Sequence, residues 1–279
     1  MFITFEKTIN TIMSELENET IRLLDGEVLP VDQVLSSMDN DSYYYGYLGK
    51  AALSSSSCKL LLESPKRYRN SLNRVQKETA ALRDGKLLHA MALEPETVPH
   101  RYALSSSSTR TTKAFKEMQA AEQREVFLEK EWNSMKWLNN QLFSCDEAVA
   151  LLSDGVAEQP MIGEIFGVPF RAKADYLKDG HIVDYKTTAD LSGFGRAAKF
   201  KWHYDMQAYI YTQLFNVDTF TFLVIEKGSG EIGIFETSES FLESGKLKVQ
   251  RAVENYQNYF TQLDPQKYNI DNYVKKGIL

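Results

Sequence analysis

The stretch from residue 168 to residue 188 constrains the fold most, because it reads as two buried strands joined by a tight turn. Apolar residues dominate both runs, and Lys178-Asp179-Gly180 separates them. An Asp-Gly pair between two such runs is a strong hairpin signal. Runs this rich in apolar side chains are typical of strands that are covered on both faces. The stretch therefore predicts a β-hairpin inside a buried sheet.

Charged side chains interrupt this apolar hairpin. Asp175 precedes the turn, and Asp184 and Lys186 follow it. Successive side chains on a strand alternate, so Asp184 and Lys186 share one side while Tyr185 points away. Folding at the turn brings Asp175 beside Asp184. Two carboxylates and a lysine in one small volume suit a hard divalent cation such as Mg²⁺ and a water held against a phosphodiester.

Two other interpretations of these charges are open. They could be ordinary solvated charges on an acidic hairpin, because motifs this short occur often by chance. The apolar flanks argue against this, since buried charges need partners or a metal. A glycosidase could use Asp175 and Asp184 as its acid and base. The adjacent lysine would depress both pKa values, however, whereas the acid must stay protonated.

Length and composition narrow the class of protein. With 279 residues, of which 43% are hydrophobic, the chain can hold one large α/β domain with helical additions or two modest domains. Cys58 and Cys145 are too few for a Cys₄ zinc site or a four-cysteine iron–sulfur cluster. No apolar run is long enough to span a membrane, and the first residues lack signal-peptide features. We therefore expect a cytoplasmic protein without a membrane partner.

The charge distribution restricts how the chain could bind nucleic acid. The net charge is −6 and the pI is near 5.4, so binding by bulk electrostatics is disfavoured. Residues 59–86 hold eight basic and three acidic side chains, a local charge of +5. This window predicts a phosphate-facing patch, although a mixed-charge solvated helix surface is the alternative. The candidate DNA contacts are Lys66, Arg67, Arg69 and Arg74, together with Lys113.

Helical patterns surround the hairpin. In the helix expected over 78–93, Gly85 and His89 share a face, and the glycine would admit another backbone. In the helix expected over 204–215, Gln207 and Tyr211 lie one turn apart. The tyrosines of 43–47 could stack on unpaired bases or pack against neighbouring helices. We further expect a loop over 105–112, helices over 113–152, a strand near 161–164, a hairpin over 219–237 and a helix over 239–260.

Four motifs in chain order resemble the exonuclease VIII (RecE-type) branch of the PD-(D/E)xK nucleases. The resemblance extends from about residue 53 to residue 260. One departure is Lys173-Ala174 before Asp175, where relatives usually carry Arg-Pro. The motifs are Gly85-x-x-x-His89-x-x-x-Leu93-Glu94-Pro95, Ala174-Asp175, Val183-Asp184-Tyr185-Lys186-Thr187-Thr188 and Tyr204-Asp205-x-Gln207-x-x-x-Tyr211.

The resemblance implies roles for individual residues. His89, Asp175 and Asp184 would bind Mg²⁺ together with the backbone carbonyl of Tyr185, with Mn²⁺ as a possible substitute. Lys186 would orient or activate the attacking water. The remaining candidates are Gln207 and Tyr211, which would support the site or the DNA backbone, and Glu158, which lies where RecB-type relatives carry an additional acidic residue.

The resemblance also implies a function. It is the Mg²⁺-dependent degradation of linear double-stranded DNA from 5′ ends in the cytosol of a bacterium or a phage-infected host. The resulting 3′ single strands would pass to a single-strand annealing partner in recombination. Sustained digestion favours a ring-like homo-oligomer, a trimer or tetramer. The alternatives are an endonuclease or single-strand nuclease of the same superfamily, and a non-catalytic DNA-binding protein that retains the fold.

The expected architecture is a mixed α/β fold of the PD-(D/E)xK, restriction-endonuclease-like type. Its central mixed sheet is flanked by helices and carries the metal site, and helices are added at the N-terminus. We place a helical and aromatic extension at 1–48, the nuclease domain at 49–262 and a C-terminal tail at 263–279.

Overall fold

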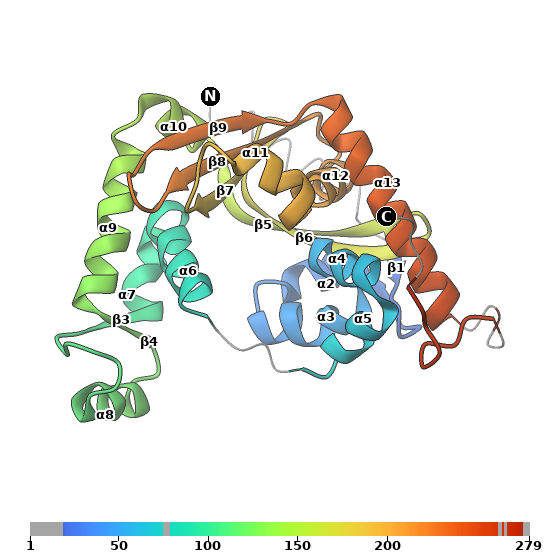
Figure 1. Cartoon of the computed structure of the whole chain (residues 1–279), viewed down its shortest axis with the longest axis horizontal. Helices are drawn as coiled ribbons and strands as arrows, with labels where there is room; N and C mark the ends of the chain where they lie inside the picture. The colour runs from blue at the N-terminus through green and yellow to red at the C-terminus, as the bar shows by residue number, and fades with distance from the viewer. Residues whose placement is uncertain (1–18, 75–78, 262–263, 265–266, 276–279) are drawn as a thin grey trace.

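The computed structural model describes residues 19–74, 79–261, 264 and 267–275. Its centre is a five-stranded mixed sheet in the order β5-β6-β7-β8-β9 (Figure 1). β7 and β8 run parallel, and the other neighbours are antiparallel. The predicted mixed α/β fold with a central sheet is confirmed. The strands are β5 (Val156–Ile165), β6 (Val168–Lys178), β7 (His181–Thr188), β8 (Thr219–Glu226) and β9 (Ile232–Glu236).

The predicted hairpin turn joins β6 to β7. Asp179 has φ +40° and Gly180 has φ +75°, so both turn residues occupy the left-handed region. Tight two-residue turns of this kind match the twist of the flanking strands and favour Asp and Gly. The ladder between β6 and β7 contains only three residue pairs, from Tyr176–Val183 to Lys178–His181. Beyond Tyr176 the two strands separate.

Helices cover both faces of the sheet. On one face lie α4 (Ser55–Glu63), α12 (Tyr204–Phe215) and α13 (Glu239–Phe260), which share a core with Ile182 and Phe222. On the other face lie α6 (Ala80–Leu93), α9 (Glu129–Phe143) and α10 (Asp146–Leu151), which pack with Val183 and Tyr185. Because side chains alternate along β7, this strand contributes to both cores. The helices predicted over 204–215 and 239–260 are confirmed with these bounds.

An arm extends from the face of the sheet that α6 and α9 cover. β3 (Tyr102–Ser105) pairs in parallel with β4 (Glu125–Leu128), and α8 (Lys113–Ala121) connects them and stands away from the main sheet (Figure 1). The expectation of uninterrupted helices over 113–152 was wrong at β4. Its four residues are too few to show a strand period, and pairing with β3 stabilises them.

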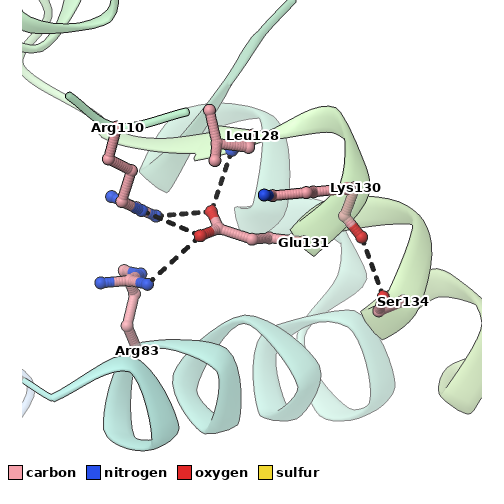
Figure 2. Close-up of polar contacts among 6 residues, drawn as sticks. All are labelled: Arg83, Arg110, Leu128, Lys130, Glu131 and Ser134. Atoms are coloured by element: carbon pink, nitrogen blue, oxygen red, sulfur yellow. Dashed lines mark hydrogen bonds and ion pairs between the residues drawn. The ribbon is translucent and has the colours of Figure 1, made fainter. Parts of the chain in front are cut away.

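Glu131 joins this arm to α6 (Figure 2). Its carboxylate accepts two hydrogen bonds from Arg110, at 2.7 and 3.0 Å, and one from Arg83 at 3.5 Å. It also accepts the backbone N–H of Leu128 at 3.0 Å, which caps α9. One partly buried carboxylate therefore fixes a loop of the arm, a helix start and α6 at one point.

The N-terminal segment forms a small unit of its own. A hairpin of β1 (Thr20–Arg22) and β2 (Val28–Pro30) leads into α2 (Val31–Ser37), the π-helical turn η1 (Ser42–Tyr47) and α3 (Leu48–Ala51). The helical addition is confirmed, and the short hairpin within it was not predicted. The part of the extension at 1–18 lies outside the described residues. Leu53 connects the unit to β6 through backbone hydrogen bonds to Pro169 and Arg171, each 2.9 Å long.

The remaining described elements are short. α5 (Pro65–Ser71) follows α4, and α11 (Phe194–Ala197) and η3 (Ala198–Trp202) precede α12. η2 (Pro95–Thr97) and α7 (Val98–Arg101) lead from α6 into the arm. Among the described residues, none of the helices combines the length and the apolarity that a membrane crossing demands.

Candidate active site

The candidate site lies where β6 and β7 separate. Continuing their register would place Asp175 opposite Asp184. Instead, the Asp175 carboxylate accepts the backbone N–H of Tyr185 at 2.8 Å. A side-chain oxygen thus replaces a carbonyl of the ladder, and the buried N–H keeps a partner. The separation opens room between the strands, and the same hydrogen bond fixes the Asp175 side chain there.

Three predicted metal ligands meet at this point. Ligand atoms of His89, Glu158 and Asp175 all lie within 4.8 Å of one another. They come from α6, β5 and β6, and His89 Nδ1 lies 3.7 Å from Asp175 Oδ2. The His89 ring packs against Tyr185, with ring centroids 5.3 Å apart. Residues distant in the sequence therefore form a compact group of one imidazole and two carboxylates. We call His89, Glu158 and Asp175 the candidate metal-ligand group, or metal-ligand group for short.

Glu158 has an unusual backbone. Its φ is +52° at the third residue of β5, although the register with β6 is the same on both sides of it. Non-glycine residues adopt positive φ at a steric cost, and such strain is concentrated at functional sites. This conformation accompanies the placement of the Glu158 side chain beside Asp175. The acidic position taken from RecB-type relatives thus lies within the metal-ligand group.

Electrostatics show why this group suits a cation. Burial raises the pKa of Glu158 to about 8, and the neighbouring charge of Asp175 adds to the rise, while Lys173 opposes it. A divalent cation between the carboxylates would remove their repulsion. Carboxylate oxygens suit Mg²⁺ and Mn²⁺, and an imidazole nitrogen favours the softer Mn²⁺. The residues present therefore fit either ion.

Asp184 is fully buried beside this group. Gln207 Nε2 donates to its Oδ1 at 2.6 Å, and Lys186 Nζ forms an ion pair with its Oδ2. The Lys186 ammonium therefore balances the charge on Oδ2. Burial raises the pKa of Asp184 to about 7 against the opposing effect of Lys186, and Asp175 adds to the rise. Both Asp184 oxygens thus have a partner, one from Gln207 and one from Lys186.

Lys186 remains an ammonium in this environment. Burial alone would lower its pKa, but the charges of Asp184 and Asp175 outweigh this, and the net shift is upward. Its Nζ also lies 5.4 Å from the centre of the Tyr204 ring. The side chain is therefore a fixed positive donor at neutral pH. As an ammonium it can orient a water or stabilise developing negative charge.

Gln207 and Tyr211 lie behind the carboxylates. Gln207 contacts both Asp184 and the Tyr211 hydroxyl. Tyr211 is only 9% exposed, and burial raises the pKa of its hydroxyl well above the ordinary value. Tyr211 is therefore buried behind Gln207 and Asp184, and its role at the site stays a prediction.

The predicted basic contacts are mostly engaged within the chain. Lys66 Nζ donates to the Asp271 carbonyl at 2.7 Å, and Arg69 pairs with the Asp271 carboxylate at 2.8 Å. Arg67 pairs with Glu63. Lys113 lies on α8 in the arm, 3.7 Å from Glu117, and Arg74 lies three residues beyond α5. Contact of these five residues with DNA stays a prediction.

The expected role of one glycine is not seen among the described residues. Within that part of the chain, a Cβ on Gly85 would meet nothing within 4 Å, so no described backbone approaches it closely. Gly85 lies one turn from His89 on α6. The periodicity correctly placed both residues on one helix, but it could not show what, if anything, faced the glycine.

A buried ion pair behind the site was missed. Asp205, which is 0% exposed, accepts Lys248 Nζ at 2.6 Å and Ser244 Oγ at 2.8 Å. Asp205 lies in the first turn of α12 and binds that helix to α13, so it positions Gln207 and Tyr204. The only sequence signal was that Asp205 lies within the Tyr204-Asp205-x-Gln207 motif.

The sheet, its covering helices and the Asp, Asp and Lys side chains at the strand separation define a protein of the PD-(D/E)xK type. The chain belongs to the family described as a PDDEXK-like domain of unknown function (DUF3799), whose model matches residues 54–275. The match shows the superfamily, and it does not single out the RecE-type branch. Comparison with curated proteins found no match.

Solved structures resemble the chain at low sequence identity. One from Eubacterium rectale, described as "Putative exonuclease", is 18% identical with a TM-score of 0.61, covering 86% of this chain and 95% of its own. A phage related exonuclease from Haemophilus somnus 129PT is 13% identical with a TM-score of 0.32, covering 70% of this chain and 100% of its own. The first likeness shows the shared fold.

Proposed function

We propose that this chain is a divalent-metal-dependent nuclease that degrades linear double-stranded DNA from its ends. The observation that carries the proposal is the convergence of His89, Glu158 and Asp175 within 4.8 Å, next to the buried Asp184–Lys186 pair. The family and the fold support the reaction class, since PD-(D/E)xK proteins include metal-dependent nucleases.

His89, Glu158 and Asp175 would hold the cation, with Asp184 and the carbonyl of Tyr185 as further donors. The ion would be Mg²⁺, with Mn²⁺ as a substitute. When bound, it supplies charge neutralisation at the phosphate and acidifies a water. Asp175 is already fixed by the Tyr185 N–H, so one ligand is preorganised.

Lys186 would act on the reacting groups. Its ammonium is held between Asp184 and the Tyr204 ring, so its position is defined before substrate arrives. There it would align the attacking water or stabilise the charge that develops on phosphate oxygens. Gln207 holds Asp184 from the opposite side, and Tyr211 supports Gln207. These two residues would position the site and take no part in proton transfer.

The finer features of the proposal rest on the order of the four RecE-type motifs. They are 5′ to 3′ polarity, 3′ single-stranded products, a single-strand annealing partner, a ring-like trimer or tetramer, and action in a bacterial or phage-infected cytosol. A chain of this size could hardly enclose a duplex alone, which favours an oligomer for sustained digestion.

The test is digestion of end-labelled linear duplex against covalently closed circles, with Mg²⁺, with Mn²⁺ and with EDTA. We expect nucleotides to be released from the linear duplex in either metal, with early loss of a 5′ label, and circles to survive. Nicked or linearised circles would indicate an endonuclease. Digestion confined to single strands would indicate a single-strand nuclease, and binding without release a non-catalytic DNA-binding protein.

A further inference from the structure

The N-terminal unit precedes the residues matched by the family, yet it packs on the strand that carries Asp175. The ring of Tyr44 lies 4.4 Å from the Arg171 guanidinium and 5.3 Å from Lys173 Nζ. Arg171 Nε also donates to the Leu48 carbonyl at 3.0 Å. Lys173 is two residues before Asp175 on β6. The turn η1 is therefore anchored close to the metal-ligand group.

The four tyrosines of this turn differ in what they contact. Tyr43, Tyr44 and Tyr47 pack into the hydrophobic cluster of the N-terminal unit. Tyr45 is not among the residues of that cluster and leaves 66% of its surface exposed. Its ring meets the edge of Tyr44 at 4.9 Å and 88°, so a buried neighbour orients it. Tyr43, Tyr44 and Tyr47 therefore pack the turn η1 against the N-terminal unit, and Tyr45 contributes little to this packing.

Tyr45 also lies in the electrostatic field of the site. Partial burial raises the pKa of its hydroxyl, and the negative charges of Asp41 and Glu158 add to this, with a smaller contribution from Asp175. The side chain is thus accessible to water and lies on the turn that is anchored to β6 two residues before Asp175. Arg171 and Lys173 lie against the ring of the neighbouring Tyr44, and the charge of Arg171 also acts on the Tyr45 hydroxyl.

We propose that the exposed ring of Tyr45 stacks on an unpaired base at a DNA end and so holds the adjoining phosphate at the site. The inference rests on the proposed function and adds a binding residue from outside the family match. Aromatic faces stack on any base, and nearby cations hold the backbone, which is how single-stranded nucleic acid is bound without sequence preference. A frayed end would supply such a base beside the scissile phosphate.

The experiment measures binding of a labelled duplex with a short unpaired 5′ end, in Ca²⁺ to suppress cleavage. Tyr45→Ala is compared with Tyr45→Phe, which keeps the ring, and with Trp137→Ala on α9, an exposed aromatic away from η1. Each variant is also tested on the same duplex with abasic unpaired nucleotides. Melting temperatures confirm that each variant folds.

We expect Tyr45→Ala to weaken binding roughly five- to hundredfold, the range of one base–aromatic stack. Tyr45→Phe and Trp137→Ala should stay within about twofold of the unchanged protein, and the abasic duplex should erase the difference between Tyr45 and Ala. The inference is overturned if Tyr45→Ala binds within twofold of the unchanged protein. It is also overturned if Tyr45→Phe loses as much, or if the loss persists on the abasic duplex.

Failure of the inference can be told from failure of the proposed function. If the unchanged protein and Trp137→Ala bind and cleave DNA while Tyr45→Ala matches them, only the stacking role is wrong. If the unchanged protein neither binds nor cleaves DNA, both proposals are wrong.

Discussion

Asp175 accepts a 2.8 Å hydrogen bond from the backbone N–H of Tyr185 at the point where β6 and β7 stop pairing. The bond serves two purposes. It satisfies a donor that strand separation would leave unpaired, and it orients a carboxylate of the metal-ligand group. Substitution at Asp175 can therefore affect the backbone as well as the chemistry, and a suitable variant should separate the two.

Asp175→Asn is that variant, because an amide oxygen can still accept the Tyr185 N–H. We expect a nearly unchanged melting temperature, together with a loss of at least about tenfold in Mn²⁺ affinity and of DNA cleavage. Calorimetric titration with Mn²⁺ and the end-labelled assay measure these effects. Asp218→Asn, an exposed position near β8, is the control and should change neither. Normal cleavage by Asp175→Asn would exclude it as a ligand.

Lys186→Ala should abolish cleavage while leaving DNA binding largely intact. The ammonium touches Asp184 and the Tyr204 ring, so its removal takes away the proposed water-orienting group but no predicted DNA contact. Cleavage rates and binding of the same duplex in Ca²⁺ measure the two effects. Lys199→Ala on η3 is the control and should change neither quantity. Near-normal turnover by Lys186→Ala would contradict the catalytic role of Lys186.

Metal affinity should rise with pH. Burial raises the pKa of Glu158 to about 8, so the folded apoprotein binds a proton there below that pH. A cation that binds to Glu158 must displace this proton. Mn²⁺ affinity should increase by up to about tenfold per pH unit between pH 6 and 8 and level off above. Titrations across this range check the slope, and Glu158→Gln should flatten it. A pH-independent affinity in the unchanged protein would contradict the assignment.

The same residue links apoprotein stability to pH. A carboxyl group with a raised folded pKa contributes stability that is complete below its ordinary pKa of 4.5 and is lost as pH rises through about 8. In EDTA, the melting temperature should therefore fall between pH 6 and pH 9, and saturating Mn²⁺ should restore it. Glu158→Gln should be less sensitive to pH in EDTA.

Lys248→Met should destabilise the fold strongly. It leaves the fully buried Asp205 carboxylate without its 2.6 Å partner, and removing one member of a buried pair costs about 3–5 kcal/mol. Lys246→Met, two residues away on α13, removes an exposed 3.6 Å pair with Glu243 and should cost under about 1 kcal/mol. Urea unfolding compares the two variants. Equal effects would show that Asp205 does not need Lys248.

Glu131→Gln should loosen the arm. It removes the negative charge that Arg83 and Arg110 share, and we expect a loss of about 1–3 kcal/mol in the free energy of unfolding. Cleavage by a protease in the loop over 106–112 should accelerate, because Arg110 holds that loop. Glu129→Gln, exposed in the same helical turn, provides the baseline. Unchanged proteolysis would show that other contacts hold the arm.

The sequence predicted those parts of the fold whose signals are local. The hairpin at Asp179-Gly180 and the helices α12 and α13 follow from turn chemistry and periodicity, and their structure agrees. β4 was missed because its stability comes from pairing with β3, about 20 residues earlier. The hairpin of β1 and β2 was missed for a similar reason, since three-residue strands carry no period.

The candidate site was less accessible to reasoning from the sequence. Alternation along β7 placed Asp184 with Lys186, but their distance from His89 depended on how α6 packs against the sheet. The left-handed backbone of Glu158 has no sequence signature, because glycine is the usual marker of positive φ. Tyr45 could not be told from its three neighbours until their burial was known.

Leu53 forms a parallel bridge with Phe170 on the side of β6 that β7 has left. This single residue shields an internal sheet edge whose unpaired N–H and C=O groups could otherwise recruit another chain. A protein cut before residue 54 would retain the whole family match and every metal ligand named above. It would nevertheless expose that edge, so we expect it to self-associate and aggregate where the longer chain does not.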